Sequence, residues 1–391
     1  MSKKLPLGLQ DFGGIIADGY KYVDKTRYIH EMATSGKYFF LSRPRRFGKS
    51  ITVSTLHALF NGSHELFKGL WIEDKWDWNR VRPVVKLSLK DVNFEQRGLE
   101  EPLAERIAEV GTRNGIDLKA TTARDKFREL ILALSERGKV VVLVDEYDAP
   151  IVHYLGKELD TAYANRELLK GFYSVLKELD TLLELVFLTG VSKFSKTGIF
   201  SGLNNLVDLT THPDYATMLG YTQAELEDNF SEEINAACAA LGLSRDQLLE
   251  EMRDWYNGYR FEENAPTVYN PISVNNFFHQ KKFDNFWFAT GTPTFLIQIL
   301  KQQGVFDLQA IGQSTLDFES FDLEDIRLFG LLYQTGYLTI QSRDEFGQYT
   351  LDYPNREVKN SMLAYLFEAF GGVSKGTGVS MAIKLERAFI A

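Results

Sequence analysis

Short apolar runs alternate with longer amphipathic segments between about residues 37 and 210. The runs are rich in β-branched and aromatic residues and predict five strands, at 38–42, 83–89, 140–145, 183–189 and 206–210. Between them, apolar residues recur every three or four positions and predict helices within 49–62, 99–115, 123–138 and 165–180. The run "VVVLVD" has no alternation, as expected for a strand buried on both faces. The pattern predicts an α/β fold with a doubly wound parallel sheet.

The pattern changes after about residue 215, where three helical segments follow with few strand-like runs. From about residue 315, a helical stretch leads into two short strands across a polar turn at Gly347, which suggests a small winged-helix-like module. Further helix is predicted from Ser361 to the C-terminus. We therefore expect a domain at 1–215, a helical lid domain at 216–314, and a winged-helix-like module with C-terminal helices at 315–391.

Composition narrows the class of protein. The 391 residues are 44% hydrophobic and include 18 Tyr and 28 Phe, too many aromatic residues for a disordered chain. The net charge of -9 gives no general attraction to nucleic acid. No run of about 18 apolar residues predicts a membrane span, and the lone Cys238 cannot form an internal disulfide. A cytoplasmic location is the expectation.

The segment "SRPRRFGKS" lies between the first strand and the first helix, and it ends like a phosphate-binding loop. In such a loop Gly48 allows close backbone approach, Lys49 contacts the β- and γ-phosphates, and the Ser50 hydroxyl ligates Mg²⁺. The usual first glycine is replaced by Arg43. That arginine either adds positive charge near the phosphates or simply tolerates the backbone angle. A basic surface turn is the alternative interpretation of the four residues "FGKS".

A second element favours the nucleotide site. Asp145 and Glu146 follow the most apolar strand, at the end where open α/β sheets bind ligands. An Asp there can hold the Mg²⁺ shell, and the adjacent Glu can polarise the attacking water. The end of the next strand offers Thr189 and Ser192 as groups that could reach the γ-phosphate or that water.

Eight segments in order resemble the bacterial AAA-ATPase-like family, P-loop proteins of the additional-strand class. They include "LPLGLQDFGGIIADGYKYVDKTRYI", "RPRRFGKS", "VDEYDAP", "LTGVSKFSKTGIFSGLNNL", "WYNGYRF", "YNPISVNNF" and "WFATGTPTFL", within about residues 5–365. The family's own loop reads RPRRFGKS, so the resemblance makes Arg43 a family feature. It also implies an ATPase domain that is often fused to a PD-(D/E)XK nuclease-like domain, which we expect to be absent from this chain. The E-x-K at Glu357 is not expected to be catalytic.

The expected function is Mg-dependent ATP binding and hydrolysis by a switch or motor. The expected catalytic residues are Glu146, Lys49, Ser192 and Arg260, the last as an arginine that reaches the γ-phosphate. The nucleotide is expected at Arg45, Arg46, Phe47, Gly48, Lys49, Ser50 and Ile51, and Mg²⁺ at Ser50 and Asp145. The alternative is a nucleotide-sensing module with little turnover that holds a protein or DNA partner through the C-terminal segments, or regulates a nuclease domain. Self-association into a homo-oligomer is left open.

Overall fold

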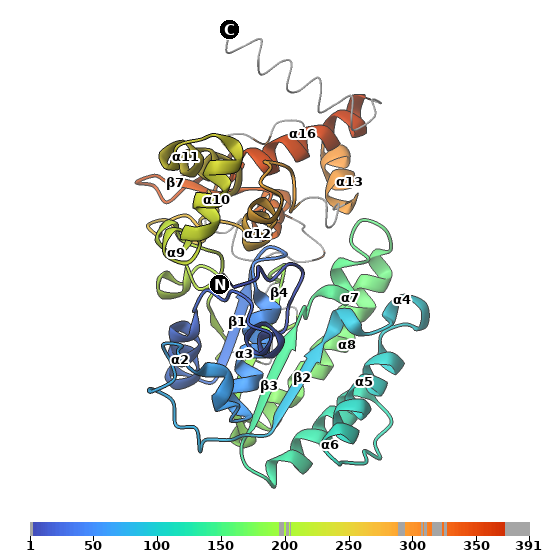
Figure 1. Ribbon diagram of the computed structural model, residues 1–391. Coiled ribbons are helices and arrows are strands. Elements are labelled where there is room, and N and C mark those ends of the chain that lie inside the picture. The colour runs from blue at the N-terminus through green and yellow to red at the C-terminus, as the bar shows by residue number, and fades with distance from the viewer. Residues whose placement is uncertain are drawn as a thin grey trace.

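A parallel β-sheet forms the centre of the first half of the molecule (Figure 1). The computed structural model describes residues 3–194, 199–200, 203, 205–287, 294–305, 308, 311–314, 323 and 327–371. The strands are β1 (Tyr38–Ser42), β2 (Val84–Ser88), β3 (Val140–Asp145), β4 (Leu183–Gly190) and β5 (Val207–Asp208). Their order in the sheet is β2-β3-β4-β1-β5, and every neighbouring pair is parallel. The predicted α/β fold with five parallel strands is confirmed.

The strand bounds follow the predicted apolar runs closely, except at the edge strand β5. β1 and β3 span the predicted residues, and all residues of both are buried. β5 has two residues where five were predicted. It ends early because the backbone N–H of Thr210 donates to the Asp208 carboxylate, 2.8 Å away, and so leaves the strand ladder.

Four long helices connect the strands. They are α3 (Lys49–Phe60), α5 (Glu100–Arg113), α6 (Ala123–Ser135) and α8 (Leu159–Glu178), and only α8 begins well before its predicted start. The chain moves from β1 outward to β2 through α3, and returns through α5, α6 and α8 to β3 and β4. Right-handed crossovers in opposite directions place these two groups on opposite faces of the sheet. Contacts of α6 with both α5 and α8 agree with this double winding.

Short elements not predicted from the hydrophobic pattern complete this part of the chain. They are α1 (Phe12–Ala17), α2 (Thr26–Ser35), α4 (Phe94–Arg97), α7 (Ala149–Val152), and the 3-10 turns η1 (His64–Phe67), η2 (Leu89–Asp91), η3 (Asp180–Leu182) and η4 (Pro213–Tyr215). The N-terminal segment is tied to α3, since the backbone N–H of Phe12 donates to the Ser54 hydroxyl at 2.7 Å.

The second half of the described chain is mainly helical. It contains α9 (Gln223–Asn229), α10 (Ser231–Leu241), α11 (Arg245–Tyr256), α12 (Pro271–Gln280), α13 (Thr294–Gln303), α15 (Leu328–Thr335) and α16 (Arg356–Gly371). Capping boxes begin α9 at Thr222 and α11 at Ser244, and Asn270 caps α12 ahead of a proline. Among the helices of the described chain, none is long and apolar enough to cross a membrane.

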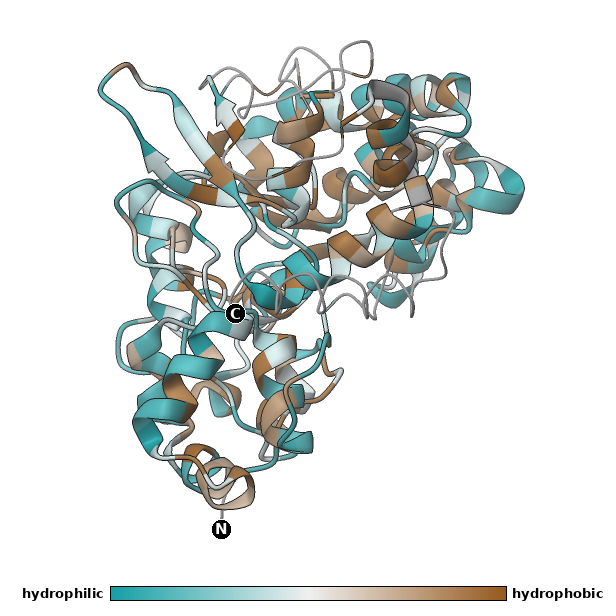
Figure 2. Cartoon of the chain, turned by 90° about the horizontal axis from the view of Figure 1, so that it is seen from above, coloured by the Kyte–Doolittle hydropathy of each residue, from teal (hydrophilic) through white to brown (hydrophobic). Residues whose placement is uncertain are grey.

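A small antiparallel sheet follows α15. β7 (Thr339–Arg343) and β8 (Tyr349–Asp352) form the predicted hairpin, and β6 (Ile311–Gln313) pairs with the other side of β8. In Figure 2 the hairpin projects from the body of the molecule, with hydrophilic colouring toward its tip. The helix and hairpin are confirmed, whereas their identity as a winged-helix module stays a prediction. The predicted helix beyond residue 371 lies outside the described residues.

The hydrophobic cores do not follow the three expected domains. One cluster runs from Phe12 in the first segment to Leu366 in α16, and so joins the sheet to the C-terminal part. A second cluster belongs to the helices between Leu226 and Phe278 and includes Val23 from the N-terminal segment. The boundaries at residues 215 and 314 remain a prediction, but the first and last regions share one core.

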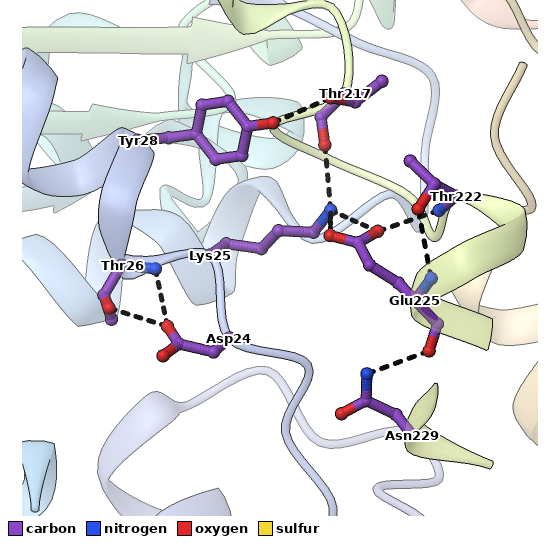
Figure 3. Close-up of polar contacts among 8 residues, drawn as sticks. All are labelled: Asp24, Lys25, Thr26, Tyr28, Thr217, Thr222, Glu225 and Asn229. Carbon is purple, nitrogen blue, oxygen red and sulfur yellow. Dashed lines mark hydrogen bonds and ion pairs between the residues drawn. The ribbon is translucent and has the colours of Figure 1, made fainter. Parts of the chain in front are cut away.

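Lys25 links the N-terminal segment to the helical half (Figure 3). Its ammonium donates to the Thr217 carbonyl at 2.8 Å and to both carboxylate oxygens of Glu225 at 2.6 and 2.7 Å. Tyr28 adds a hydrogen bond to the Thr217 hydroxyl at 2.7 Å. Burial lowers the pKa of Lys25, and Glu225 opposes that effect. The family-like segment "YVDKTRY" therefore serves to hold the two halves of the molecule together.

Candidate nucleotide-binding site

The carboxyl ends of the central strands lie level with one another. Ser42 at the end of β1 pairs in register with Gly190 of β4, and Ser88 of β2 pairs with Asp145 of β3. β4 lies between β1 and β3 in the sheet. The segments that follow β1, β3 and β4 therefore emerge at one edge, where open α/β sheets place their ligands.

The loop after β1 has a tightly defined backbone. Gly48 precedes α3 with a φ of 106°, a left-handed conformation that favours glycine. Arg46 also has a positive φ, 69°, which is uncommon for a residue with a side chain. Phe47 is buried and packs edge-on against Tyr259 and Phe261, with ring centroids 4.8 and 5.5 Å away. The Phe47 side chain thus anchors the loop to the second half of the protein.

Arg43 points away from the phosphate loop. Its guanidinium donates to the carbonyls of Thr210 at 2.6 Å and Tyr215 at 3.2 Å, and lies 4.1 Å from the Phe261 ring centroid. The side chain is only 1% exposed, and burial lowers its pKa to about 10. Arg43 is not among the positive-φ residues. Glycine is therefore not required at this position, and of the two explanations considered for Arg43, added charge at the phosphates finds no support in this geometry.

Lys49, Ser50 and Asp145 come together across β1 and β3. The Lys49 ammonium lies inside the loop and donates to the carbonyls of Arg43 at 2.7 Å and Pro44 at 2.9 Å. The Ser50 side chain lies near the Asp145 carboxylate and favours its charged form. Burial lowers the pKa of Lys49 to about 8, although the nearby carboxylates of Glu146, Asp145 and Asp148 oppose this. Burial also raises the pKa of Asp145.

Glu146 begins the turn after β3 with a φ of 50°. Such left-handed conformations at residues other than glycine are often found at functional sites. Its carboxylate lies 3.8 Å from the ammonium of Lys90, which follows β2 and is mostly exposed. Glu146 therefore sits beside Lys49 and faces a cation from the neighbouring strand.

The most extensively hydrogen-bonded acid at this edge is Asp148, which the sequence reasoning missed. Its carboxylate accepts from the backbone N–H groups of Val191 and Ser192, at 3.1 and 2.7 Å, and from the Ser192 hydroxyl at 2.5 Å. A Cβ on Gly190 would lie 2.5 Å from Asp148 Oδ1 and 2.6 Å from the Tyr147 ring. Asp148 thus fixes the end of β4 against the turn after β3. Its position three residues after Asp145, beside the end of β3, is the sequence feature that could have indicated a role at this site.

A pocket of about 520 Å³ opens at this edge of the sheet. It lies in the size range of cofactor sites. Of the predicted nucleotide-binding residues, Arg45, Arg46, Gly48, Lys49, Ser50 and Ile51 line it, as does Glu146. The N-terminal segment contributes Leu9 and Gln10, and the second half contributes Tyr221, Ile272, Asn275, Trp287 and Tyr337. These residues carry no catalytic signature that sequence reasoning could have used.

Four predicted site residues, Asp145, Phe47, Ser192 and Arg260, are not among the residues that line this pocket. Phe47 and Ser192 are buried, and the Ser192 hydroxyl is engaged with Asp148. Arg260 donates from its guanidinium to the Gln341 carbonyl of β7 at 2.8 Å, and its backbone N–H donates to Thr339. The Arg260 side chain therefore points to β7 and not into the pocket, and the buried hydroxyl of Thr189 does not line the pocket either.

The C-terminal part contacts both the phosphate loop and the segment after β4. The indole N–H of Trp287 donates to the Arg45 carbonyl at 3.0 Å, and Gln334 accepts from the backbone N–H of Lys193 at 2.8 Å. The backbone N–H of Trp287 in turn donates to Glu357, which is completely buried. Burial raises the pKa of Glu357 to about 7. The E-x-K glutamate is thus buried at the start of α16 and hydrogen-bonded to Ser273 and Trp287.

The site suits a magnesium ion that is shared with phosphate oxygens. Mg²⁺ prefers oxygen ligands and keeps several waters or phosphate oxygens in its shell. The hydroxyl of Ser50 and the carboxylate of Asp145 lie near each other and would supply two such oxygens. Within the described ranges, no group of three or more His, Cys, Asp or Glu side chains is placed to hold a metal ion. A magnesium ion at Ser50 and Asp145 would therefore also need phosphate oxygens or waters as ligands.

The sheet order, the loop before α3 and the paired Ser50 and Asp145 define the class of P-loop nucleotide-binding folds. Comparison with known proteins agrees with this class. A family described as "Predicted AAA-ATPase" matches residues 6–200. The uncharacterized protein in the vnfD 5' region of Azotobacter chroococcum mcd 1 is 40% identical over 369 residues, covering 92% of this chain and 69% of that protein. The chain belongs to the AAA-ATPase-like family.

Proposed function

We propose that the protein binds ATP with Mg²⁺ at the pocket beside the phosphate loop and hydrolyses its terminal phosphoanhydride bond. The observation that carries the proposal is the proximity of Ser50 to Asp145, with the ammonium of Lys49 near the same carboxylate at the N-terminus of α3. Oxygen ligands for Mg²⁺, a cation for the phosphates and a helix N-terminus meet at one point, as phosphoryl transfer requires.

Each residue has a role that follows from its position. Backbone N–H groups from Gly48 onward and the Lys49 ammonium bind the phosphates, and Ser50 with Asp145 hold the ion. Glu146 lines the pocket one residue beyond Asp145, where its carboxylate can accept a proton from the attacking water. Asp148 acts by positioning, because it holds the turn after β4 against the same edge.

The test is Mg-dependent phosphate release by the purified chain. Glu146→Gln should lower the rate by about 10²–10⁴-fold, the usual contribution of a general base, with ATP affinity changed only a few-fold. Glu95→Gln is the matched control, because Glu95 lines the same pocket but lies 3.3 Å from His153. Unchanged hydrolysis in Glu146→Gln would contradict the catalytic assignment. Loss of ATP binding in Lys49→Ala checks the phosphate site separately.

A nucleotide-sensing module with little turnover is the second candidate. It is favoured by the contacts of the C-terminal part with the phosphate loop, through Trp287 to Arg45, and with the segment after β4, through Gln334 to Lys193. Through them, a change at the phosphate loop would reach the segments proposed to hold a protein or DNA partner. Tight ATP binding in calorimetry with negligible phosphate release would favour this function over hydrolysis.

A further inference from the structure

The peptide between Arg45 and Arg46 lies in the strained part of the phosphate loop. Arg46 has a φ of 69°, a left-handed conformation that is unfavourable for a residue with a side chain. Such conformations persist only where the surrounding contacts hold them. The Lys49 ammonium binds the two preceding carbonyls, those of Arg43 and Pro44. The Arg45 carbonyl is not among its partners, so this peptide needs support from outside the loop.

Trp287 supplies that support from the second half of the chain. Its indole N–H donates to the Arg45 carbonyl at 3.0 Å. The residue is 5% exposed, and its ring lies against those of Tyr337 and Tyr259, with centroids 5.3 and 6.3 Å away. Its backbone N–H donates to the Glu357 carboxylate at 2.7 Å. The indole is therefore held in place by residues outside the loop.

The end of α15 packs against the same part of the loop. A Cβ added to Gly336 would lie 2.7 Å from Cβ of Pro44 and 3.4 Å from the indole ring of Trp287. Only a residue without a side chain fits between them. Because this packing is so close, the indole has little room to leave the Arg45 carbonyl.

The bond to Trp287 also fixes the direction of the next N–H group. The peptide between Arg45 and Arg46 is planar and trans, so the carbonyl of one and the N–H of the other point in opposite directions. The Arg46 N–H therefore points away from the indole. In the described part of the chain it donates to no backbone carbonyl. Arg46 lines the pocket together with Lys49, and loop N–H groups next to left-handed residues commonly bind anions.

We propose that Trp287 is a positioning residue for the phosphate loop, which holds the Arg45–Arg46 peptide so that the Arg46 N–H can donate to a phosphate oxygen. The inference rests on the proposed nucleotide site and adds to it a residue from the second half of the chain. The indole has a single donor, which is engaged with Arg45, so Trp287 does not bind the phosphates itself. Without that donor the peptide can rotate to relieve the strain at Arg46, and the phosphate loses a partner.

The experiment measures ligand affinity in variants that remove the indole N–H. Dissociation constants for ATP and for inorganic triphosphate, both with Mg²⁺, are obtained by calorimetry, and urea denaturation reports the stability of each protein. Trp287→Phe keeps an aromatic ring. Benzothienylalanine at the same position keeps both fused rings and replaces only the N–H by sulfur. Trp255→Phe is the matched control, because Trp255 stacks on Phe283 in the helical half and is not among the described residues that line the pocket.

We expect both Trp287 variants to bind ATP and inorganic triphosphate about 5–10-fold more weakly than the wild type, the effect of one lost hydrogen bond. The factor should be the same for both ligands, because the loop contacts the phosphates that they share. Trp255→Phe should keep the wild-type affinities. A purely structural role of Trp287 would instead lower the urea midpoint and leave both affinities of the folded protein unchanged.

Three results would overturn the inference and leave the proposed function intact. The first is unchanged affinity of the benzothienylalanine protein for both ligands. The second is a loss of affinity for ATP alone, because the indole would then act on the nucleoside and not on the loop. The third is a wild type that binds ATP but not inorganic triphosphate, because the loop would then not hold phosphates by itself. A wild type that binds neither ligand would refute the proposed function, and this inference with it.

Discussion

Replacing Arg43 with glycine would restore the usual sequence of a phosphate-binding loop, yet we expect it to destabilise the protein. The Arg43 guanidinium holds the carbonyls of Thr210 and Tyr215 and lies over the Phe261 ring. Without it, two carbonyls lose a charged donor inside the protein. Because Arg43 does not have a positive φ, the backbone at this position does not need the conformational freedom that glycine provides.

The size of the effect follows from these contacts. Each hydrogen bond lost from the charged guanidinium costs about 1.5–3 kcal/mol, the ring contact adds about 1–2 kcal/mol, and the glycine adds about 0.5–1 kcal/mol. Against this stands the burial of the charge, which lowers the pKa of Arg43 to about 10 and corresponds to roughly 3 kcal/mol. The net loss in the free energy of unfolding is about 3 kcal/mol.

Urea denaturation followed by circular dichroism measures this difference. Arg43→Met is the companion variant, because it retains much of the side-chain volume and removes only the donors. We expect Arg43→Gly to unfold at a clearly lower urea concentration than the wild type, with Arg43→Met between them. An unfolding midpoint of Arg43→Gly equal to or above that of the wild type would refute the reasoning.

Three further predictions concern other parts of the site. Gly190→Ala should lower the free energy of unfolding by about 1–3 kcal/mol, since its Cβ would overlap Asp148 and Tyr147; urea denaturation measures this, with the uncrowded Gly171→Ala as control. The pKa of Glu357 in the folded protein, about 7, lies above its ordinary value of 4.5. Its contribution to stability is therefore full below about pH 4.5 and is lost as the pH rises to about 7. Thermal unfolding across this pH range should show the wild type losing about 3 kcal/mol of unfolding free energy, a loss that is missing in Glu357→Gln. Bound phosphates would raise the pKa of Lys49 from about 8, so the affinity for ATP should fall as the pH rises above 8. Calorimetry in two buffers should show that the protein takes up protons when it binds ATP in this pH range. An ATP affinity that stays constant up to about pH 10 would contradict this.

Much of the sheet could be predicted, because its strands are buried on both faces and appear as unbroken apolar runs. β1 and β3 matched their predicted bounds for this reason. The loop of Gly48, Lys49 and Ser50 could be predicted because a phosphate-binding loop needs these residue types at consecutive positions between a strand and a helix. Asp145 could be placed because the end of an apolar strand fixes where it emerges.

The remaining features depend on tertiary contacts that leave no local pattern. β5 was overestimated because an Asp208 side chain, not the apolar pattern, ends it. Arg43 appears in the sequence as a loop residue, but its partners lie about 170 residues further along the chain. Asn275 and Trp287 line the pocket only because the second half of the chain folds over the sheet edge, and no spacing within their own helices and turns reports that.

The shared hydrophobic core has a practical consequence for dissecting the molecule. A chain ending at residue 215, the boundary that the sequence pattern indicates, would contain the whole phosphate loop. It would also strip Phe47 of its two ring partners, leave the Arg45 carbonyl without the indole of Trp287, and remove the apolar residues of α15 and α16 that complete the core. Such a fragment would expose a broad apolar surface to water and would aggregate, so the nucleotide chemistry should be studied in the intact chain.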